Sequence, residues 1–116
     1  MAGRKLEHLN ETVRQKLGQL LIKEASDPRF HSVTITGVTV AKDLSTARVQ
    51  FSAYDSSVSP QVLADLLNKA AGFFGHALAR SLNTRRTPRL HFYYDPGFDY
   101  ALEMDLLLKK ALPEDD

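Results

Sequence analysis

The segment from Leu66 to Tyr94 contains basic residues and no acidic residue. Its cationic and titratable side chains are Lys69, His76, Arg80, Arg85, Arg86, Arg89 and His91. The whole chain is nearly balanced, with 15 Lys and Arg against 14 Asp and Glu, so its charges are unevenly distributed. An acid-free basic segment in a near-neutral chain predicts one positive surface that binds a polyanion. The alternative is that the arginines are scattered over a solvated surface.

The stretch NTRRTPRLHF places Arg85, Arg86 and Arg89 around Pro88. The planar guanidinium fork of arginine matches phosphate bidentately, so these residues are candidates for phosphate contacts. They could instead stabilise the C-terminus of the preceding helix, where positive charge is favourable. The two roles are compatible, because a capping arginine still projects its charge outward.

Catalytic and cofactor motifs are absent from the sequence. The four histidines form no metal-binding spacing, and the chain has no cysteine, no Walker loop and no dinucleotide fingerprint. His91, Tyr93 and Asp95 share one face of a predicted strand, but no nucleophile-elbow sequence surrounds Ser52 or Ser81. We therefore expect a protein that is not an enzyme and uses no cofactor or metal, with a small hydrolase using His91 and Asp95 as a remote alternative.

Apolar spacing predicts the elements that position the basic segment. Apolar residues at three- and four-residue steps predict a helix over about residues 5–25, which Pro28 ends. The stretch 33–40 alternates as a strand but changes phase at Gly37, which predicts a bulge there. After a turn at 41–45, a second alternating strand completes a hairpin. Its expected inward residues are Ala47, Val49, Phe51 and Ala53, and its outward ones are Arg48, Gln50 and Ser52.

The second half of the chain predicts a bent helix, a strand and a last helix. Ser59 and Pro60 fit a helix start, and helical apolar spacing continues to Leu82. Residues 90–94 alternate as a third strand, and a short helix follows and ends before Pro113. We expect an α+β fold, with helices covering one face of a three-stranded sheet.

The octapeptide NKAAGFFG interrupts the bent helix with two glycines. Its GFFG matches the G-x-x-G loop with which KH domains clamp a nucleic-acid backbone, but phenylalanines are unsuited to an exposed clamp. We therefore predict a kink at Ala70, Ala71 and Gly72, where small residues allow close helix approach and the amides of the next helix face a phosphate. The alternative is a purely structural bend.

Length and composition predict a single domain over residues 1–116, with a short acidic tail at about 113–116. No run reaches the length of a membrane-spanning helix, and the N-terminus has no signal-peptide core. We expect a cytoplasmic monomer that has neither a membrane partner nor a small-molecule substrate.

Several motifs together resemble the ribosome-binding factor A family over nearly the whole chain. The segment DPRF, residues 27–30, is followed by SVTITGVTVAKDLSTARV, which resembles the first two strands of that family. The segment LLNKAAGFFGHALARSLNTRRTPRLHFYYD resembles the family's A-x-G kink and its L-x-x-R-x-x-P-x-L-x-F-x-x-D pattern. The positions that match the second pattern are Leu82, Arg85, Pro88, Leu90, Phe92 and Asp95.

The resemblance implies a type II KH-like domain with a mixed sheet, in which a helix–kink–helix replaces the clamp loop. By the same analogy, the third strand would lie beside the first and parallel to it. It also implies a non-catalytic factor that binds the small ribosomal subunit late in its assembly, near the decoding region. Such a factor would help small-subunit ribosomal RNA to mature and would be linked to cold adaptation.

The resemblance also transfers residues. Ala70, Ala71 and Gly72 match the kink, and Arg85 matches the basic residue before the third strand. The family commonly has arginine where this chain has Gly75, and His76 or Arg80 can substitute for it. The expected RNA-binding residues are Lys69, His76, Arg80, Arg85, Arg86 and Arg89, with Arg4, Lys5 and Lys23 extending the surface. The alternative function is a KH-like protein-interaction or scaffolding domain that does not bind RNA.

Overall fold

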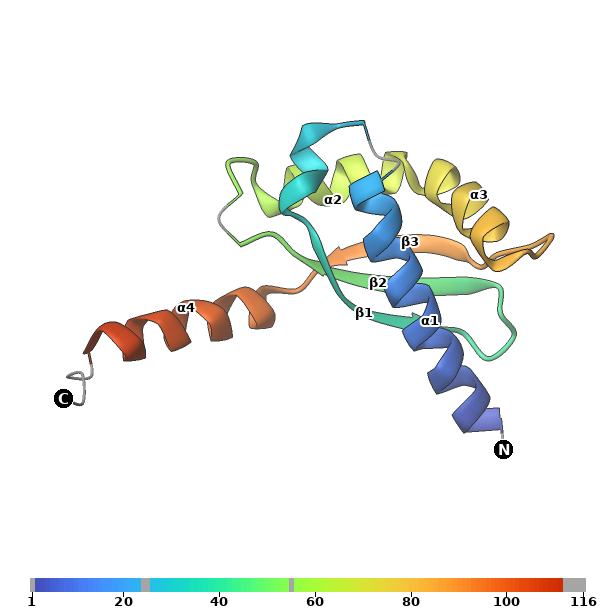
Figure 1. Ribbon diagram of the computed structural model, residues 1–116, viewed down its shortest axis with the longest axis horizontal. Coiled ribbons are helices and arrows are strands. Elements are labelled where there is room, and N and C mark those ends of the chain that lie inside the picture. The colour runs from blue at the N-terminus through green and yellow to red at the C-terminus, as the bar shows by residue number, and fades with distance from the viewer. Residues whose placement is uncertain (1, 24–25, 55, 112–116) are drawn as a thin grey trace.

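The computed structural model describes the backbone of residues 2–23, 26–54 and 56–111, and the side chains of these ranges from Lys5 onward. Three helices pack on a three-stranded sheet, and a fourth helix projects from it (Figure 1). The elements are α1 (Ala2–Lys23), the 3-10 helix η1 (Pro28–Ser32), β1 (Thr34–Val40), β2 (Thr46–Ser52), α2 (Pro60–Lys69), α3 (Ala71–Leu82), β3 (Arg89–Tyr94) and α4 (Pro96–Ala111).

The sheet has the strand order β1-β2-β3, with β2 in the centre. The hairpin between β1 and β2 is antiparallel, and its register shifts between Ile35 and Gly37, which confirms the bulge. The mixed sheet is also confirmed, but β3 runs parallel to β2 and not beside β1, so that expectation was wrong. The outer edge of β1 already faces α1, because Val40 N–H donates to Asn10 Oδ1 at 2.8 Å.

The core lies between the sheet and the helices α1, α2 and α3. The predicted inward residues of β2 are all buried, and so are Leu63, Leu67, Phe74 and Leu78 of α2 and α3. Phe74 is central, because its ring centroid lies 6.0 Å from those of Phe30 and Phe92. Burial of large apolar side chains on both helices fixes α2 and α3 to the sheet, as the continuous apolar spacing predicted.

The kink lies at Ala70, which ends α2 and begins α3. Its backbone angles, φ −90° and ψ 5°, fall outside the helical region, while its carbonyl still accepts from Phe74 N–H at 3.1 Å. The expected close helix approach at Gly72 was wrong, because a Cβ added to Gly72 would have no neighbouring atom within 4 Å. Gly72 therefore belongs to the exposed side of the first turn of α3.

The segment after α1 is held by local polar contacts. Asp27 caps η1 by accepting from Arg29 N–H at 2.9 Å, and the Arg29 side chain also donates to the Asp27 carboxylate. These hydrogen bonds lower the pKa of Asp27 to about 2. The predicted first helix extended to Ala25, which lies outside the described residues.

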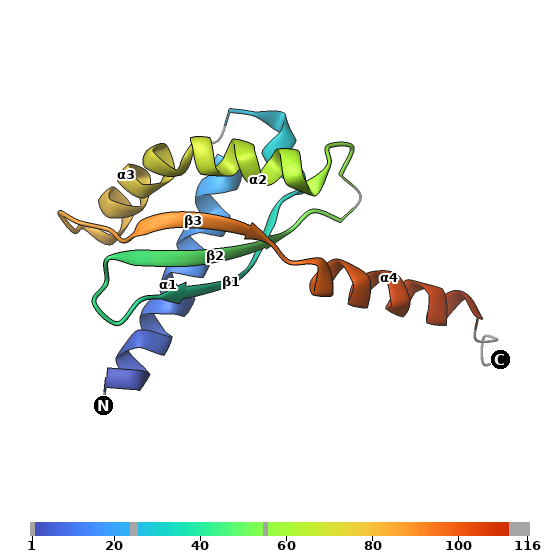
Figure 2. The same cartoon turned by 180° about the vertical axis from the view of Figure 1, so that it is seen from behind.

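The last helix differs most from expectation, because α4 is 16 residues long and has no buried residue. It projects away from the sheet, so only α1, α2 and α3 cover a sheet face (Figures 1 and 2). Asp99 anchors its first turn by accepting from Tyr94 Oη–H at 2.6 Å and from Ala53 N–H at 3.3 Å. The start of α4 thereby covers the end of β2, so Ser52 is only 2% exposed although its phase predicted an outward position. The predicted acidic tail at 113–116 lies outside the described residues.

Across the described ranges, no helix combines the length and the apolar character needed to span a bilayer.

Candidate nucleic-acid interface

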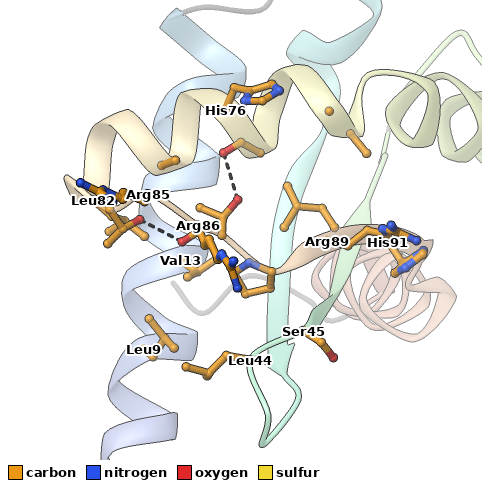
Figure 3. Close-up of a pocket in the computed structure, with 18 of the residues that line it drawn as sticks. Leu9, Val13, Leu44, Ser45, His76, Leu82, Arg85, Arg86, Arg89 and His91 are labelled. Atoms are coloured by element: carbon orange, nitrogen blue, oxygen red, sulfur yellow. Dashed lines mark hydrogen bonds between the residues drawn. The ribbon is translucent and has the colours of Figure 1, made fainter.

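A broad groove of about 1310 Å³ lies between α1, α3 and the start of β3 (Figure 3). The segment that joins α3 to β3, residues 83–88, and the hairpin turn at 43–45 complete its walls. Its cationic and titratable lining residues are His76, Arg85, Arg86, Arg89 and His91, and Asp43 is the acidic one among the described residues. The groove therefore combines side chains from segments that are distant in sequence.

Residues 83–88 carry Arg85 and Arg86, and this segment, the arginine loop, is positioned by the end of α3. Asn83 adopts the left-handed conformation, with φ 56° and ψ 45°, and Thr84 N–H donates to the Ala79 carbonyl at 3.0 Å. This pattern ends a helix and satisfies its last carbonyls. Two hydroxyls then hold the loop, because Thr84 Oγ1 donates to the Arg86 carbonyl at 3.1 Å and Thr87 Oγ1 to the Gly75 carbonyl at 3.2 Å. The exposed Arg85 and Arg86 thus stand on a loop tied to α3.

The start of β3 is fixed from two sides. Arg89 N–H donates to the Ser45 carbonyl at 3.0 Å, which joins β3 to the hairpin turn. On the outer edge of β3, Asn68 Oδ1 accepts from Phe92 N–H at 2.8 Å and Asn68 Nδ2 donates to the Phe92 carbonyl at 3.0 Å. The end of α2, the edge strand and the hairpin turn therefore form one rigid support for Arg89.

An apolar wall faces the arginine loop. Leu9 and Val13 of α1 line it together with Leu44 and Leu82 (Figure 3). Leu44 has a positive φ of 63°, which costs a side chain with a Cβ roughly 1–2 kcal/mol. Asp43 compensates by accepting from Ser45 N–H at 3.1 Å and Ser45 Oγ–H at 2.7 Å, and these bonds lower the pKa of Asp43. The apolar wall and the arginines opposite it suit a ligand that carries both flat rings and negatively charged groups.

The structure gathers some of the sequence-predicted residues and separates others. His76, Arg85, Arg86 and Arg89 line the groove. Lys69, at the end of α2, and Arg80, one helical turn after His76, are exposed on its flanks.

The predicted cations of α1 divide between its two ends. Lys5 lies one turn before Leu9 and belongs to the groove end of α1, whereas Lys23 lies 18 residues further along. Lys23 lies ten residues beyond Val13, the nearest groove-lining residue of α1, which is roughly 15 Å at 1.5 Å per residue, so Lys23 is separated from the groove. Arg4 belongs to the first turn of α1, and its side chain lies outside the described part.

Asp95, one of the groups considered for catalysis, has structural partners. Thr36 Oγ1 donates to Asp95 Oδ2 at 3.1 Å, and Asp95 Oδ1 accepts from Phe98 N–H at 3.2 Å. Asp95 therefore caps α4, which accounts for its place after the strand without a role in chemistry. In the part of the chain that the structure describes, no three His, Cys, Asp or Glu side chains are arranged to hold a metal ion.

Sequence reasoning missed the apolar wall and the support from Asn68. Because β3 was expected beside β1, nothing placed the turn at 43–45 next to Arg89. The available signal was Asn68 itself, a polar residue between the apolar Leu67 and Ala70, which could have indicated a hydrogen bond to a neighbouring backbone.

Comparison with known proteins agrees with this arrangement. The family model described as Ribosome-binding factor A matches residues 5–108. This chain belongs to the ribosome-binding factor A family. The match includes the kink at Ala70, the arginine loop and all three strands.

Individual relatives cover almost the whole chain. A ribosome-binding factor A from Pseudomonas paraeruginosa is 33% identical over 111 residues, which are 94% of this chain and 87% of the relative. One from Coxiella burnetii is 34% identical over 110 residues, which are 95% of this chain and 92% of the relative.

Solved structures of family members have the same fold. The crystal structure of ribosome-binding factor A from Thermus thermophilus aligns with a TM-score of 0.66 and 28% identity, covering 77% of this chain and 94% of that one. A homology model of the Thermus thermophilus protein, fitted into a cryo-electron microscopy map of its 30S complex, aligns with a TM-score of 0.59 and 26% identity. That alignment covers 72% of this chain and 88% of the other. The α+β fold with a mixed sheet is therefore the fold of the family.

Proposed function

We propose that this protein is a non-catalytic RNA-binding factor that associates with the small ribosomal subunit and assists late maturation of its ribosomal RNA. The observation that carries this proposal is the groove, where His76, Arg85, Arg86 and Arg89 converge beside a kinked helix pair. The 30S complex of the Thermus thermophilus relative supports the choice of partner.

Phosphate contacts would supply most of the affinity. Arg85 and Arg86 are exposed and held by the threonine hydrogen bonds, so their guanidinium groups are ready for a phosphate backbone. Gly72 lines the groove in the first turn of α3, where helix amides lack an intrahelical partner. A phosphate could therefore approach these amides without meeting a side chain.

Specificity would come from shape. Phosphate contacts carry no sequence information, so a rigid groove distinguishes RNA arrangements by how well their backbones fit it. A factor that binds one arrangement of the immature subunit more tightly shifts the population toward it. On this proposal the protein works as a cytoplasmic monomer. Its effect on the maturation of ribosomal RNA is greatest at low temperature, where misfolded RNA rearranges slowly.

Charge reversal tests the site. The variant Arg85→Glu/Arg86→Glu should fold normally, because both side chains are exposed, and should bind immature small subunits much more weakly than the unaltered chain. Lys109→Glu/Lys110→Glu on α4 changes net charge equally and serves as the matched control. Binding is measured by co-sedimentation of each variant with mature and immature subunits. Full binding by the arginine variant would refute this site.

A protein-interaction domain is the second candidate, and α4 is the observation that favours it. This projecting helix exposes Met104, Leu106, Leu107 and Leu108. Exposed apolar patches of this kind occur at protein–protein contacts. If subunit binding is lost in the α4 control and kept in the arginine variant, the second candidate replaces the first.

A further inference from the structure

The sheet has an open face on the side opposite the three packed helices. In the view from behind, β1, β2 and β3 lie in front of α1 (Figure 2). The exposed side chains of β2 and β3 on this face include Arg48, Gln50, Arg89, His91 and Tyr93. We call these five residues the open-face patch.

The register of the strands brings the patch together. Arg48 lies opposite His91, and Gln50 lies opposite Tyr93, on neighbouring parallel strands. The Arg48 guanidinium carbon lies 4.5 Å from the centroid of the Tyr93 ring, so cation and ring are stacked. Tyr93 remains 45% exposed, which leaves much of its ring available to a ligand.

The charged side chains on the strands of this face are all basic. None of the three strands contains Asp or Glu. The nearest acid along this side of β3 is Asp95, whose carboxylate is engaged by Thr36 and by the N-terminus of α4. An ordinary solvated sheet face mixes both signs and has no need of an exposed aromatic ring. The patch instead offers arginine, histidine and tyrosine, and the acids beside it, Asp43 and Asp95, are hydrogen-bonded to neighbouring groups.

We propose that the open-face patch binds single-stranded RNA, with a base stacked against Tyr93 and Arg48 and a neighbouring phosphate at Arg89. Unpaired bases stack on aromatic rings and guanidinium planes, whereas a duplex hides its base faces. Arg89 and Tyr93 are four residues apart, or about 13 Å along the strand, which accommodates about two nucleotides. A protein partner fits less well. The core of a protein–protein interface contains several apolar or aromatic side chains, whereas Tyr93 is the one such side chain of the patch.

The patch is continuous with the groove. Arg89 and His91 line the groove and also belong to the exposed side of the edge strand β3. An RNA strand that leaves the arginine loop can therefore cross β3 and reach Tyr93. The inference rests on the proposed function only in taking RNA as the partner, since the patch does not include Arg85 or Arg86.

An NMR titration tests the patch without ribosomes. The ¹⁵N-labelled chain is titrated with a short single-stranded oligouridine and, separately, with an RNA duplex of equal length. The proposal predicts that the single strand shifts amides of β2 and β3 and that the duplex does not. Tyr93→Ala should weaken single-strand affinity about tenfold, as stacking interactions of this kind do. Arg48→Ala should also weaken it.

Matched controls keep the test decisive. Tyr100→Ala and Lys110→Ala remove the same kinds of side chain from α4 and should bind the single strand as the unaltered chain does. Arg85→Glu/Arg86→Glu should keep the amide shifts in β2 and β3, so failure of the groove and failure of the patch are distinguishable. Unchanged affinity of Tyr93→Ala overturns the proposal. So does a Tyr93→Ala variant that loses subunit binding but binds oligouridine normally, because that pattern assigns the patch to a protein.

Discussion

At the scale of single residues, Asn68 shows how one side chain supports the candidate site. Its amide exchanges two hydrogen bonds with the backbone of Phe92 and so occupies the free edge of β3. Asn10 does the same with one hydrogen bond to Val40 at the opposite edge. Both edges of the small sheet are thereby occupied by side chains, which protects them from pairing with other chains.

Asn68→Ala should lower the free energy of unfolding by about 1–2 kcal/mol, since each lost hydrogen bond contributes on the order of 1 kcal/mol. Asn10→Ala, which removes one bond, should cost about half as much. Chemical denaturation of both variants measures the difference. A loss for Asn68→Ala no larger than that for Asn10→Ala would contradict the proposed support of β3.

Gly75 is the residue at which this chain differs from the arginine expected of the family. Its carbonyl accepts from Thr87, and an added Cβ would lie 3.6 Å from Thr87 Oγ1, an ordinary contact. The backbone therefore tolerates a side chain there, and glycine is not a conformational requirement. His76, which follows it in the groove, supplies the nearest titratable group.

At the scale of elements, the bend between α2 and α3 depends on Ala70, while Gly72 leaves an open space beside the first turn of α3. Gly72→Ala is not expected to straighten the bend, because Gly72 has no positive φ. The glycine thus has no structural necessity at this position. Under the proposed function, the open space beside it would let a phosphate approach the helix amides.

Gly72→Ala should raise the free energy of unfolding by up to about 1 kcal/mol, as glycine replacement in helices does, and should weaken binding to small subunits. Gly18→Ala in α1 is the matched control, because an added Cβ there also meets nothing within 4 Å. Thermal unfolding and co-sedimentation measure the two effects. If both variants bind equally well, no phosphate approaches the amides beside Gly72.

The junction between β3 and α4 should respond to alkaline pH. The hydrogen bond to Asp99, with desolvation second, raises the pKa of Tyr94 to about 12 from its ordinary 10.0. The folded state favours the neutral phenol of Tyr94. The contribution of this hydrogen-bonded phenol to the free energy of unfolding is therefore fully present below pH 10 and is lost as the pH rises through about 12.

Ultraviolet titration of the folded chain should therefore show a tyrosine ionisation step near pH 12. Tyr94→Phe should remove this late step and reduce the loss of stability above pH 10. Simultaneous ionisation of all tyrosines in the folded chain would contradict the hydrogen bond to Asp99.

The periodicity of the sequence predicted which face of each element is buried more accurately than it predicted which elements lie side by side. Alternation at Leu90 and Phe92 correctly predicted which side of β3 is buried, but it is the same whichever strand lies beside it. The consecutive Leu106, Leu107 and Leu108 define no single apolar face, so the sequence could not show that α4 leaves the sheet. The arginine loop was predictable from composition, whereas its apolar wall depended on the strand order.

At the scale of the whole molecule, a nearly neutral chain separates its charges in space. The acid-free segment 66–94 supplies α3, the arginine loop and β3, and Arg85, Arg86 and Arg89 of this segment line one groove. Electrostatic attraction of this kind depends on salt, because binding to phosphates releases counterions. A protein that bound the subunit through α4 would show little of this dependence.

The salt dependence of binding to immature small subunits is the most direct test. With five to seven phosphate contacts, log affinity should fall against log salt with a slope on the order of −4 to −6. In Arg85→Glu/Arg86→Glu, the slope should become shallower by about 2, while Lys109→Glu/Lys110→Glu should keep the original slope. A slope near zero for the unaltered chain, or the same slope in the arginine variant, would contradict phosphate binding by the groove.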